Sequence, residues 1–553
     1  MPHESSHRAT STPGNLSYWT ICNATLCPDD GKSGNDETMA ASGVNLDALI
    51  PREDFAAATV PFKGNPTGTI SMGLLKDDFF VQSLRKPDFQ RETSNWTPQK
   101  IVDLVAAFLD GDLIPAIILW RSGQYVFVID GAHRMSALLS WIYDDYGDKS
   151  RSIEFFQNQI PEEQLKLAEQ TRKLVEINIG TYASYLDANR TKFASDKVKD
   201  RLGMMNSNSF IAQWVPAVDA IGAENSFFKI NQAPTPVDSV EKRILRGRRS
   251  AIAIATRAIN RGGTGHKYWA DFSNENQAKI EAEGKAIYEA LYLPPMGGLP
   301  VKTSDVPVGG RGYSSLPFVF DLISLVNSIG SKQSLGVDSD GTLTISHLQS
   351  VRKRIERITT VSPGSLGLHP LVYFYTRGGA FQPVAFLAVL QLVKRMVDEE
   401  KLDKFIEVRR AFEDFLVAHK EAFTLIVKSQ GAGAKSRPAL EDFLWIALEG
   451  LWSGKGDPQI IESMSTDRRF RFFATPAPVR GDGEGGKKFS TSTKSAAFVI
   501  ELVQNGARCG ICGGLLHKNS ISTDHIVRKQ DGGGAHGKNA QLAHPYCNTT
   551  YKN

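Results

Sequence analysis

The 553-residue sequence predicts a multidomain α+β protein: a mixed strand and helix domain, then a largely helical domain, then a small metal-stabilised domain. Three observations support this prediction. Residues 46–245 mix strand and helix patterns, residues 246–474 show mainly helical periodicity, and residues 495–553 hold a cluster of cysteines and histidines. At roughly 100 to 200 residues per domain, a chain of this length has room for about three domains.

Residues 1–45 are predicted to be a disordered leader. They are rich in Ser, Thr, Asn, Gly and Asp without sustained periodicity, so they offer too little apolar surface to offset the entropy of ordering. They also lack the basic and apolar segments of a secretory signal. An alternative is that translation starts at Met39, just before the ordered pattern begins at Leu46; N-terminal sequencing of the native protein distinguishes the two starts.

The composition predicts a cytoplasmic protein with no membrane span. Apolar residues make up 41% of the chain and charged residues 22%, and no run reaches the ~18 consecutive apolar residues that a span needs. The formal net charge is +4, but from residue 480 onward ten Lys and Arg oppose five Asp and Glu, a net of +5. This basic excess suits a polyanionic partner, although a solvated basic tail explains it equally well.

Within residues 46–245 the pattern predicts a helix, a hairpin and a second helix. The first helix begins at Thr97, an N-cap followed by proline at the first helical position, and ends near Gly111. Two apolar runs in residues 116–129 flank an Arg-Ser-Gly turn and predict the hairpin. Helical spacing resumes soon afterwards, so residues 130–134 are predicted to form a strand-to-helix turn.

Residues 246–474 are predicted to form a helical domain whose apolar stripes are ordinary core. Two basic clusters, residues 246–249 and 352–354, could contact phosphates, but a solvated helix face is the simpler explanation. Residues 475–494 are rich in Pro, Gly, Ser and Thr and have few apolar groups, which predicts a flexible linker.

The C-terminal segment places four metal ligands in two tight turns. Cys509 and Cys512 form a C-x2-C turn, and His544 and Cys547 close the segment with the same spacing. Thiolate and imidazole ligands in such pairs suit a closed, tetrahedral structural Zn²⁺ site. That ion would stabilise a segment too short to make its own core. A zinc ribbon without catalytic activity would have the same ligands.

Further polar residues lie between and beside the two turns, in types that suit phosphodiester hydrolysis. This reaction needs an activated water and a metal beside the scissile phosphate. His525 is a candidate base because an imidazole titrates near neutral pH. Asp524 and Asn548 offer hard oxygen ligands for Mg²⁺ or Mn²⁺. Asn539 follows a glycine-rich turn between them.

This order of residues closely resembles the HNH nuclease family, whose catalytic domain is a ββα-metal fold. The resemblance implies a metal-dependent endonuclease that acts on double-stranded DNA with His525 as its base. It also implies that Asn539 holds the loop carrying His525 in place and does not touch the metal. His544 stands where a cysteine is more common in the family and is itself a good zinc ligand.

The predicted turn at residues 130–134 carries a second resemblance. Its sequence, Asp-Gly-Ala-His-Arg, is similar to the DGQQR signature of the ParB/sulfiredoxin-like domain in modification-dependent restriction enzymes of the GmrSD type. An upstream QR…W element ending at Trp96 and a later F-x-x-I-N…E element fit the same family. The resemblance implies a nucleotide- or phosphate-binding site formed by Asp130, Gly131, His133, Arg134, Gln90, Arg91, Asn231 and Glu241.

A glycine turn that enters a helix presents backbone N–H groups, and Arg134 and Arg91 can add charge-assisted bonds to phosphate. Such a site suits a nucleoside triphosphate or a DNA backbone. Ala132 and His133 replace the two glutamines of the signature, so binding is predicted more strongly than NTPase activity. Alternatively, Arg134 pairs with Asp130 or Glu241 and serves only the fold.

The two resemblances favour an antiphage restriction enzyme. In this hypothesis the N-terminal domain senses a nucleotide or modified DNA and licenses the tethered nuclease, and the linker gives that nuclease reach. The expected partner is phage DNA or modified DNA. One alternative is a ParB-like, nucleotide-switched DNA-binding protein whose zinc module only grips DNA. Another is an ungated repair or mobile-element nuclease. The sequence does not determine the modification, the nucleotide or whether a homo-oligomer forms.

Overall fold

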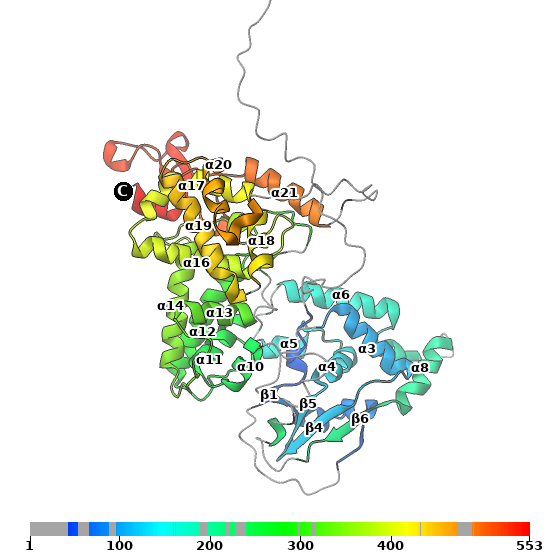
Figure 1. Ribbon diagram of the computed structural model, residues 1–553. Helices are drawn as coiled ribbons and strands as arrows, with labels where there is room; N and C mark the ends of the chain where they lie inside the picture. Colours follow the sequence, from blue (N-terminus) through cyan, green and yellow to red (C-terminus); the bar gives the residue numbers. More distant parts are fainter. Residues whose placement is uncertain are drawn as a thin grey trace, which may run out of the picture.

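The computed structural model describes residues 43–53, 66–87, 96–156, 158, 160, 162–188, 196–216, 222–224, 226, 239–296, 299–310, 316–431, 433–473, 489 and 491–552. Figure 1 shows the N-terminal domain in blue and cyan, the helical domain in green to orange and the C-terminal segment in red. This arrangement of a mixed domain, a helical domain and a C-terminal segment confirms the α+β organisation expected from the sequence.

The N-terminal domain is built on a mixed sheet, in which the described residues form six strands in the order β1-β3-β5-β4-β6-β2. The predicted hairpin is confirmed as the antiparallel pair β4 and β5, while β3 pairs parallel with β5 and β6 pairs parallel with β4. The strands are β1 (Arg52–Glu53), β2 (Thr69–Ser71), β3 (Leu84–Pro87), β4 (Ile117–Ser122), β5 (Tyr125–Asp130) and β6 (Ser209–Trp214).

Helices cover this sheet, and alternate residues of each strand face opposite sides. Val126 and Val128 of β5 pack into the main core with the helices, whereas Phe127 and Ile129 pack on the other face, against Leu245. The helices of this domain are α1 (Met72–Lys76), α2 (Asp78–Ser83), α3 (Pro98–Asp110), α4 (Ala132–Tyr143), α5 (Ser150–Phe155), α6 (Glu162–Asn178), α7 (Tyr182–Ala188) and α8 (Asp196–Ser207).

Helix α3 confirms the boundaries predicted from its capping residues. The Thr97 hydroxyl accepts a hydrogen bond from the Lys100 backbone N–H, and Gly111 ends the helix with a left-handed φ of 78°. The predicted strand-to-helix turn is confirmed as well, because β5 ends at Asp130 and α4 begins at Ala132. Gly131 between them has a φ of 98°, a conformation that favours glycine.

The folded chain begins slightly earlier than predicted. Val44 is fully buried and its N–H bonds to the Trp96 carbonyl, and the Asn45 N–H donates to Gln164 Oε1 at 2.9 Å. These contacts hold residues 43–45 in the N-terminal domain, so their assignment to a disordered leader was wrong. The rest of the predicted leader lies outside the described residues.

The middle of the chain is helical, as its periodicity predicts. The apolar core of this helical domain continues into the C-terminal segment, where it includes Val499, Leu515 and Ala543. No helix among the described residues is long and apolar enough to span a bilayer. The helices are α10 (Ser239–Arg246), α11 (Ala251–Asn260), α12 (Asn274–Tyr292), α13 (Leu316–Val326), α14 (Thr342–Ile358), α15 (Pro370–Tyr373), α16 (Pro383–Asp398), α17 (Leu402–Ala418), α18 (Glu421–Gln430), α19 (Arg437–Trp452), α20 (Asp457–Ser465) and α21 (Thr491–Asn505).

The end of the predicted linker is also corrected. Residues 474–488 and 490 lie outside the described residues, but α21 begins at Thr491, so residues 491–494 are helical. The reason is a tertiary contact: the Ser495 hydroxyl is buried, donates to the Thr491 carbonyl and accepts a hydrogen bond from the Val301 N–H at 3.0 Å. This contact docks the first turn of α21 on the helical domain.

A buried carboxylate joins the N-terminal and helical domains. Asp47 contacts Arg52 at 3.0 Å and Lys86 at 2.7 Å within its own domain, and Arg261, at the end of α11, at 3.5 Å. Burial alone would raise the pKa of Asp47, but the three cations hold it well below its usual value. Asp47 is therefore charged at neutral pH and compensates cations from both domains.

We expect Asp47→Asn to lower the free energy of unfolding by about 3–5 kcal/mol, because loss of one partner leaves buried cations uncompensated. Urea denaturation followed by tryptophan fluorescence measures this change. Asp112→Asn, at an exposed position after α3, is the matched control and should change stability by less than about 0.5 kcal/mol. Equal effects of the two substitutions would contradict the role given to Asp47.

Candidate metal centre and active site

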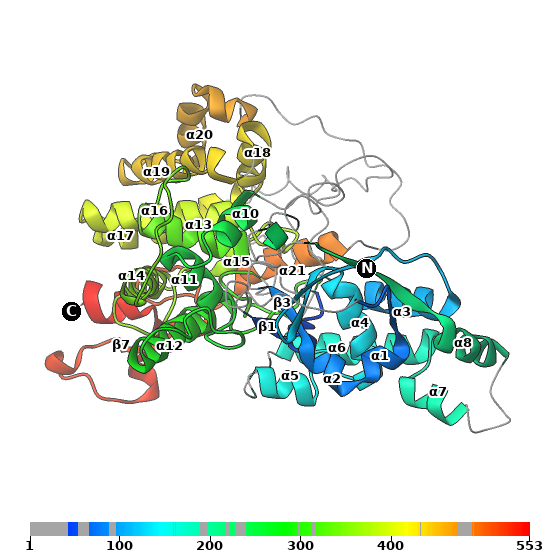
Figure 2. The same cartoon turned by 90° about the horizontal axis from the view of Figure 1, so that it is seen from below.

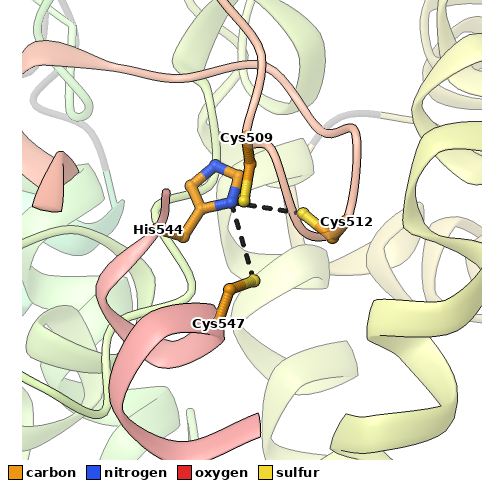
Figure 3. Close-up of side chains that lie close together, drawn as sticks. All are labelled: Cys509, Cys512, His544 and Cys547. Atoms are coloured by element: carbon orange, nitrogen blue, oxygen red, sulfur yellow. Dashed lines mark hydrogen bonds between the residues drawn. The ribbon is translucent and has the colours of Figure 1, made fainter. Parts of the chain in front are cut away.

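Two tight turns bring the four predicted metal ligands together. Cys509 and Cys512 follow α21, His544 follows strand β8, and Cys547 begins the last helix, Cys547–Tyr551. All four are buried, and their ligand atoms lie within 4.8 Å of one another. Figure 3 shows the three sulfur atoms and the imidazole of His544 converging on one point. Three thiols and one imidazole are the donor set of a structural zinc site.

The orientation of His544 suits a metal ligand. Its Nε2 lies 3.0 Å from the Leu515 carbonyl, to which it can donate, while Nδ1 lies 3.3 Å from Cys512 Sγ and 3.9 Å from Cys547 Sγ. Burial and the nearby Arg409 lower the pKa of His544. The imidazole is therefore neutral, and the carbonyl fixes the tautomer in which Nδ1, the nitrogen that faces the cysteine sulfur atoms, carries the lone pair.

A buried ion pair on α17 supports this cluster. Arg409 is fully buried, donates to the carbonyls of Leu366 and Gly367, and places Nη1 3.1 Å from His544 Nδ1. Its Nε donates to Glu413 at 2.8 Å. Burial opposes the charge of Arg409, but Glu413 and the nearby thiols raise its pKa above the usual value. The cluster thus rests on a charged side chain of the helical domain.

Glu413 completes the support from the other side. Its Oε2 accepts a hydrogen bond from the Leu515 N–H at 2.7 Å, and its Oε1 accepts one from the Tyr373 hydroxyl at 3.1 Å. Sequence reasoning missed this pair. The available signal was its position, because Arg409 and Glu413 lie on the same face of α17 as the apolar residues that form the core.

Strands β7 (Ser522–His525) and β8 (Ala540–Ala543) form the hairpin that positions the predicted catalytic residues. They pair antiparallel, with Asp524 opposite Gln541. Asp524 is 5% exposed, and its Oδ2 accepts hydrogen bonds from Gln541 Nε2 at 2.7 Å and Lys552 Nζ at 2.6 Å. His525, the last residue of β7, is only partly buried. Lys552 was not singled out from the sequence.

Asn539 forms three hydrogen bonds that hold the loop following His525 in place. Its Oδ1 accepts a hydrogen bond from the Val527 N–H at 2.8 Å, and its Nδ2 donates to the carbonyls of Val527 and Gly534, at 3.1 and 2.9 Å. Gly533 is required in this loop, since a Cβ there would lie 1.9 Å from the Val527 carbonyl oxygen. These are the contacts that a loop-holding residue needs.

Asn548 lies beside the same hairpin. It belongs to the last helix, and its Nδ2 donates to Ser522 Oγ at 3.2 Å and to the Thr523 carbonyl at 3.3 Å. Both acceptors precede Asp524 on β7. The structure thus gathers Asp524, His525 and Asn548 around one strand.

The turn in the N-terminal domain has a different arrangement. Arg134 Nη2 lies 2.6 Å from Asp130 Oδ2, and Nη1 donates to the Pro115 carbonyl at 2.7 Å. The alternative in which Arg134 pairs with Asp130 therefore describes the observed contact. A phosphate-binding role for Arg134 stays a prediction.

The other residues predicted for that site are only partly described. His133 stacks on Trp96 with ring centroids 5.6 Å apart, which brings one signature residue to the aromatic residue of the upstream element. Glu241 lies in the first turn of α10. The predicted residues Gln90, Arg91 and Asn231 lie outside the described residues.

Comparison with models of known protein families gave matches at both ends of the chain. Residues 75–245 match the N-terminal domain of the GmrSD restriction endonuclease, and residues 509–553 match the HNH endonuclease. No curated protein and no solved structure matches the chain. An HNH endonuclease domain implies DNA as the substrate. Together the two matches support a GmrSD-like fusion, in which a domain similar to the N-terminal domain of the GmrSD restriction endonuclease precedes an HNH endonuclease domain.

Proposed function

We propose that this protein is a metal-dependent HNH DNA endonuclease of antiphage defence, gated by an N-terminal domain that senses a nucleotide or modified DNA. The observation that supports it most is the grouping of Asp524, His525 and Asn548 around strand β7, beside the Cys/His cluster. The match to an HNH endonuclease over the same residues supports the nuclease chemistry. The GmrSD match suggests restriction.

In this proposal the Cys/His cluster binds a structural Zn²⁺. Four protein ligands complete a tetrahedral site and leave no position for a substrate, which distinguishes it from a catalytic zinc. The zinc would fix the relative positions of the two turns that flank the β7–β8 hairpin. The catalytic residues then depend on zinc for their placement and not for their chemistry.

The proposed catalytic metal is Mg²⁺ or Mn²⁺, held by Asp524 and Asn548. The buried carboxylate and the side-chain amide are hard oxygen donors, so the residues present fit such an ion. When bound, the ion supplies positive charge beside the scissile phosphate. His525 takes the proton of the attacking water, and its partial exposure at the end of β7 leaves the imidazole within reach of solvent and DNA.

The structure changes how gating would work. The sequence suggested a nuclease on a flexible linker, but the C-terminal segment shares the apolar core of the helical domain. Gating by a nuclease that moves on a flexible linker is therefore not part of this proposal. A signal from the N-terminal domain would instead pass through the helical domain, which it contacts at Asp47 and Arg261.

His525→Ala should lower Mg²⁺-dependent cleavage of supercoiled plasmid by about 10²-fold or more, the usual contribution of a general base. Zinc content should stay unchanged, because the imidazole of His525 is not in the Cys/His cluster. The matched control is His536→Ala, at an exposed position in the same domain, which should retain most of the activity. Full activity of the His525 variant would refute the assignment.

Cys547→Ser should release the zinc, because a neutral hydroxyl is a much poorer ligand than a thiolate. Elemental analysis of purified protein should find one zinc per wild-type chain and a large loss in the variant, together with a lower melting temperature. Cys27→Ser, which changes none of the four residues of the Cys/His cluster, is the control and should keep its zinc. Full zinc content in the Cys547 variant would show that the cluster is not the zinc site.

Cleavage of modified and unmodified phage DNA with Mg²⁺, across a panel of nucleoside triphosphates, tests the sensing role. We expect at least one modification or nucleotide to change the cleavage rate by about tenfold or more, a typical size for coupling between two sites. Equal cleavage of every substrate under every condition would remove the sensor and leave an ungated nuclease. Binding of DNA without any nicking would favour the DNA-binding alternative.

A further inference from the structure

Lys552 makes a set of contacts that the proposed chemistry does not use. It directly follows the last helix, and its Nζ lies 2.6 Å from Asp524 Oδ2. The same Nζ lies 2.5 Å from the His525 carbonyl oxygen and 3.4 Å from that of Ile526. One carboxylate oxygen and two carbonyl oxygens at the end of β7 therefore surround this ammonium.

The ion pair between Lys552 and Asp524 is largely shielded from water. Their side chains are 17% and 7% exposed. The attraction between opposite charges is several times stronger in such surroundings than in bulk water. Gln541 donates to the same carboxylate oxygen at 2.7 Å, so Oδ2 already receives two hydrogen bonds, one of them from a full positive charge.

A divalent cation would compete with this ammonium. It binds a carboxylate through the oxygen lone pairs that an ammonium also uses, and it prefers the hard oxygen donors that surround Lys552 Nζ. Two cations that share one carboxylate also repel each other. A metal at Asp524 must therefore displace Lys552 or bind against its charge.

We propose that Lys552 is a resident counter-ion of Asp524 that weakens metal binding in the DNA-free protein. This inference rests on the proposed function, because it takes Asp524 as the metal ligand. DNA phosphates add negative charge at the site and relieve the repulsion between metal and ammonium. Lys552 thereby couples metal binding to DNA binding, and by linkage each ligand favours the other.

A purely structural role for Lys552 predicts a different outcome. Its bonds to the carbonyls of His525 and Ile526 could serve only to hold the end of β7. Removal of the ammonium would then disturb Asp524 and leave metal affinity unchanged or weaker. A counter-ion predicts the opposite sign, since its removal exposes an uncompensated carboxylate to the metal.

The test titrates Mn²⁺ into the full-length, zinc-loaded protein without DNA and measures free Mn²⁺ by electron paramagnetic resonance. Lys552→Gln should bind Mn²⁺ at least about fivefold more tightly than wild type, which corresponds to about 1 kcal/mol. Lys552→Arg keeps the charge and should stay within about twofold of wild type. Zinc content and melting temperature, measured in parallel, establish that each variant is folded.

One control isolates the effect of position, and one further variant of Lys552 guards against misfolding. Lys529→Gln removes one exposed positive charge from the same domain and should change Mn²⁺ affinity by less than about twofold, because solvent screens that charge. If Lys552→Gln loses its zinc, Lys552→Met keeps the aliphatic stem and allows the same comparison.

Asp524→Asn separates failure of the inference from failure of the proposed function. It should abolish this Mn²⁺ site. If Mn²⁺ binding survives in that variant, Asp524 is not the metal ligand, and both the metal assignment and the inference are overturned. If Asp524→Asn abolishes binding but removal of the Lys552 charge leaves affinity unchanged or weaker, only the inference is overturned.

Discussion

The buried pair of Arg409 and Glu413 on α17 joins the helical domain to the nuclease segment. Arg409 approaches His544 and bonds to two carbonyls before α15, and Glu413 accepts the Leu515 N–H. A buried ion pair is tolerated only when its remaining hydrogen-bonding groups are satisfied within the protein. The pair has partners in the helical domain and in the C-terminal segment, so it holds the two Cys/His turns against α17. The β7–β8 hairpin between these turns is thereby positioned on the helical domain.

This constraint places the proposed catalytic residues relative to the rest of the molecule. Figures 1 and 2 show the red C-terminal segment and the N-terminal sheet on opposite sides of the helical domain. The N-terminal domain contacts that domain through the buried charges around Asp47, and the nuclease segment contacts it through Arg409. A sensing event would thus reach the hairpin through packed helices, and the nuclease would meet DNA at a fixed orientation. Lys552 adds a local control, since it neutralises Asp524 before DNA arrives.

The sequence predicted those features that depend on short spacings. The four residues of the Cys/His cluster form two pairs, each with two residues between its members. Thr97 and Gly111 mark the two ends of one helix, and a short turn joins β4 to β5. The support of the cluster depends on contacts over long separations: Arg409 and His544 lie 135 residues apart. The position of this pair on the apolar face of α17 could indicate its burial, but no local spacing shows that it meets His544 and Leu515. The docking of α21 through Ser495 and the contact of Lys552 with Asp524 were missed for the same reason.

The central claim is that the metal cluster and the helical domain form one cooperative unit. Hydrogen exchange followed by mass spectrometry, with and without a zinc chelator, tests it most directly, because exchange reports local stability along the chain. The account predicts that loss of zinc lowers protection in residues 509–552. It predicts the same in α17 and in residues 365–367, whose carbonyls bond to Arg409 or to the C-terminal segment. Loss of protection confined to residues 509–552, with α17 unchanged, would contradict the claim and restore the picture of a tethered nuclease.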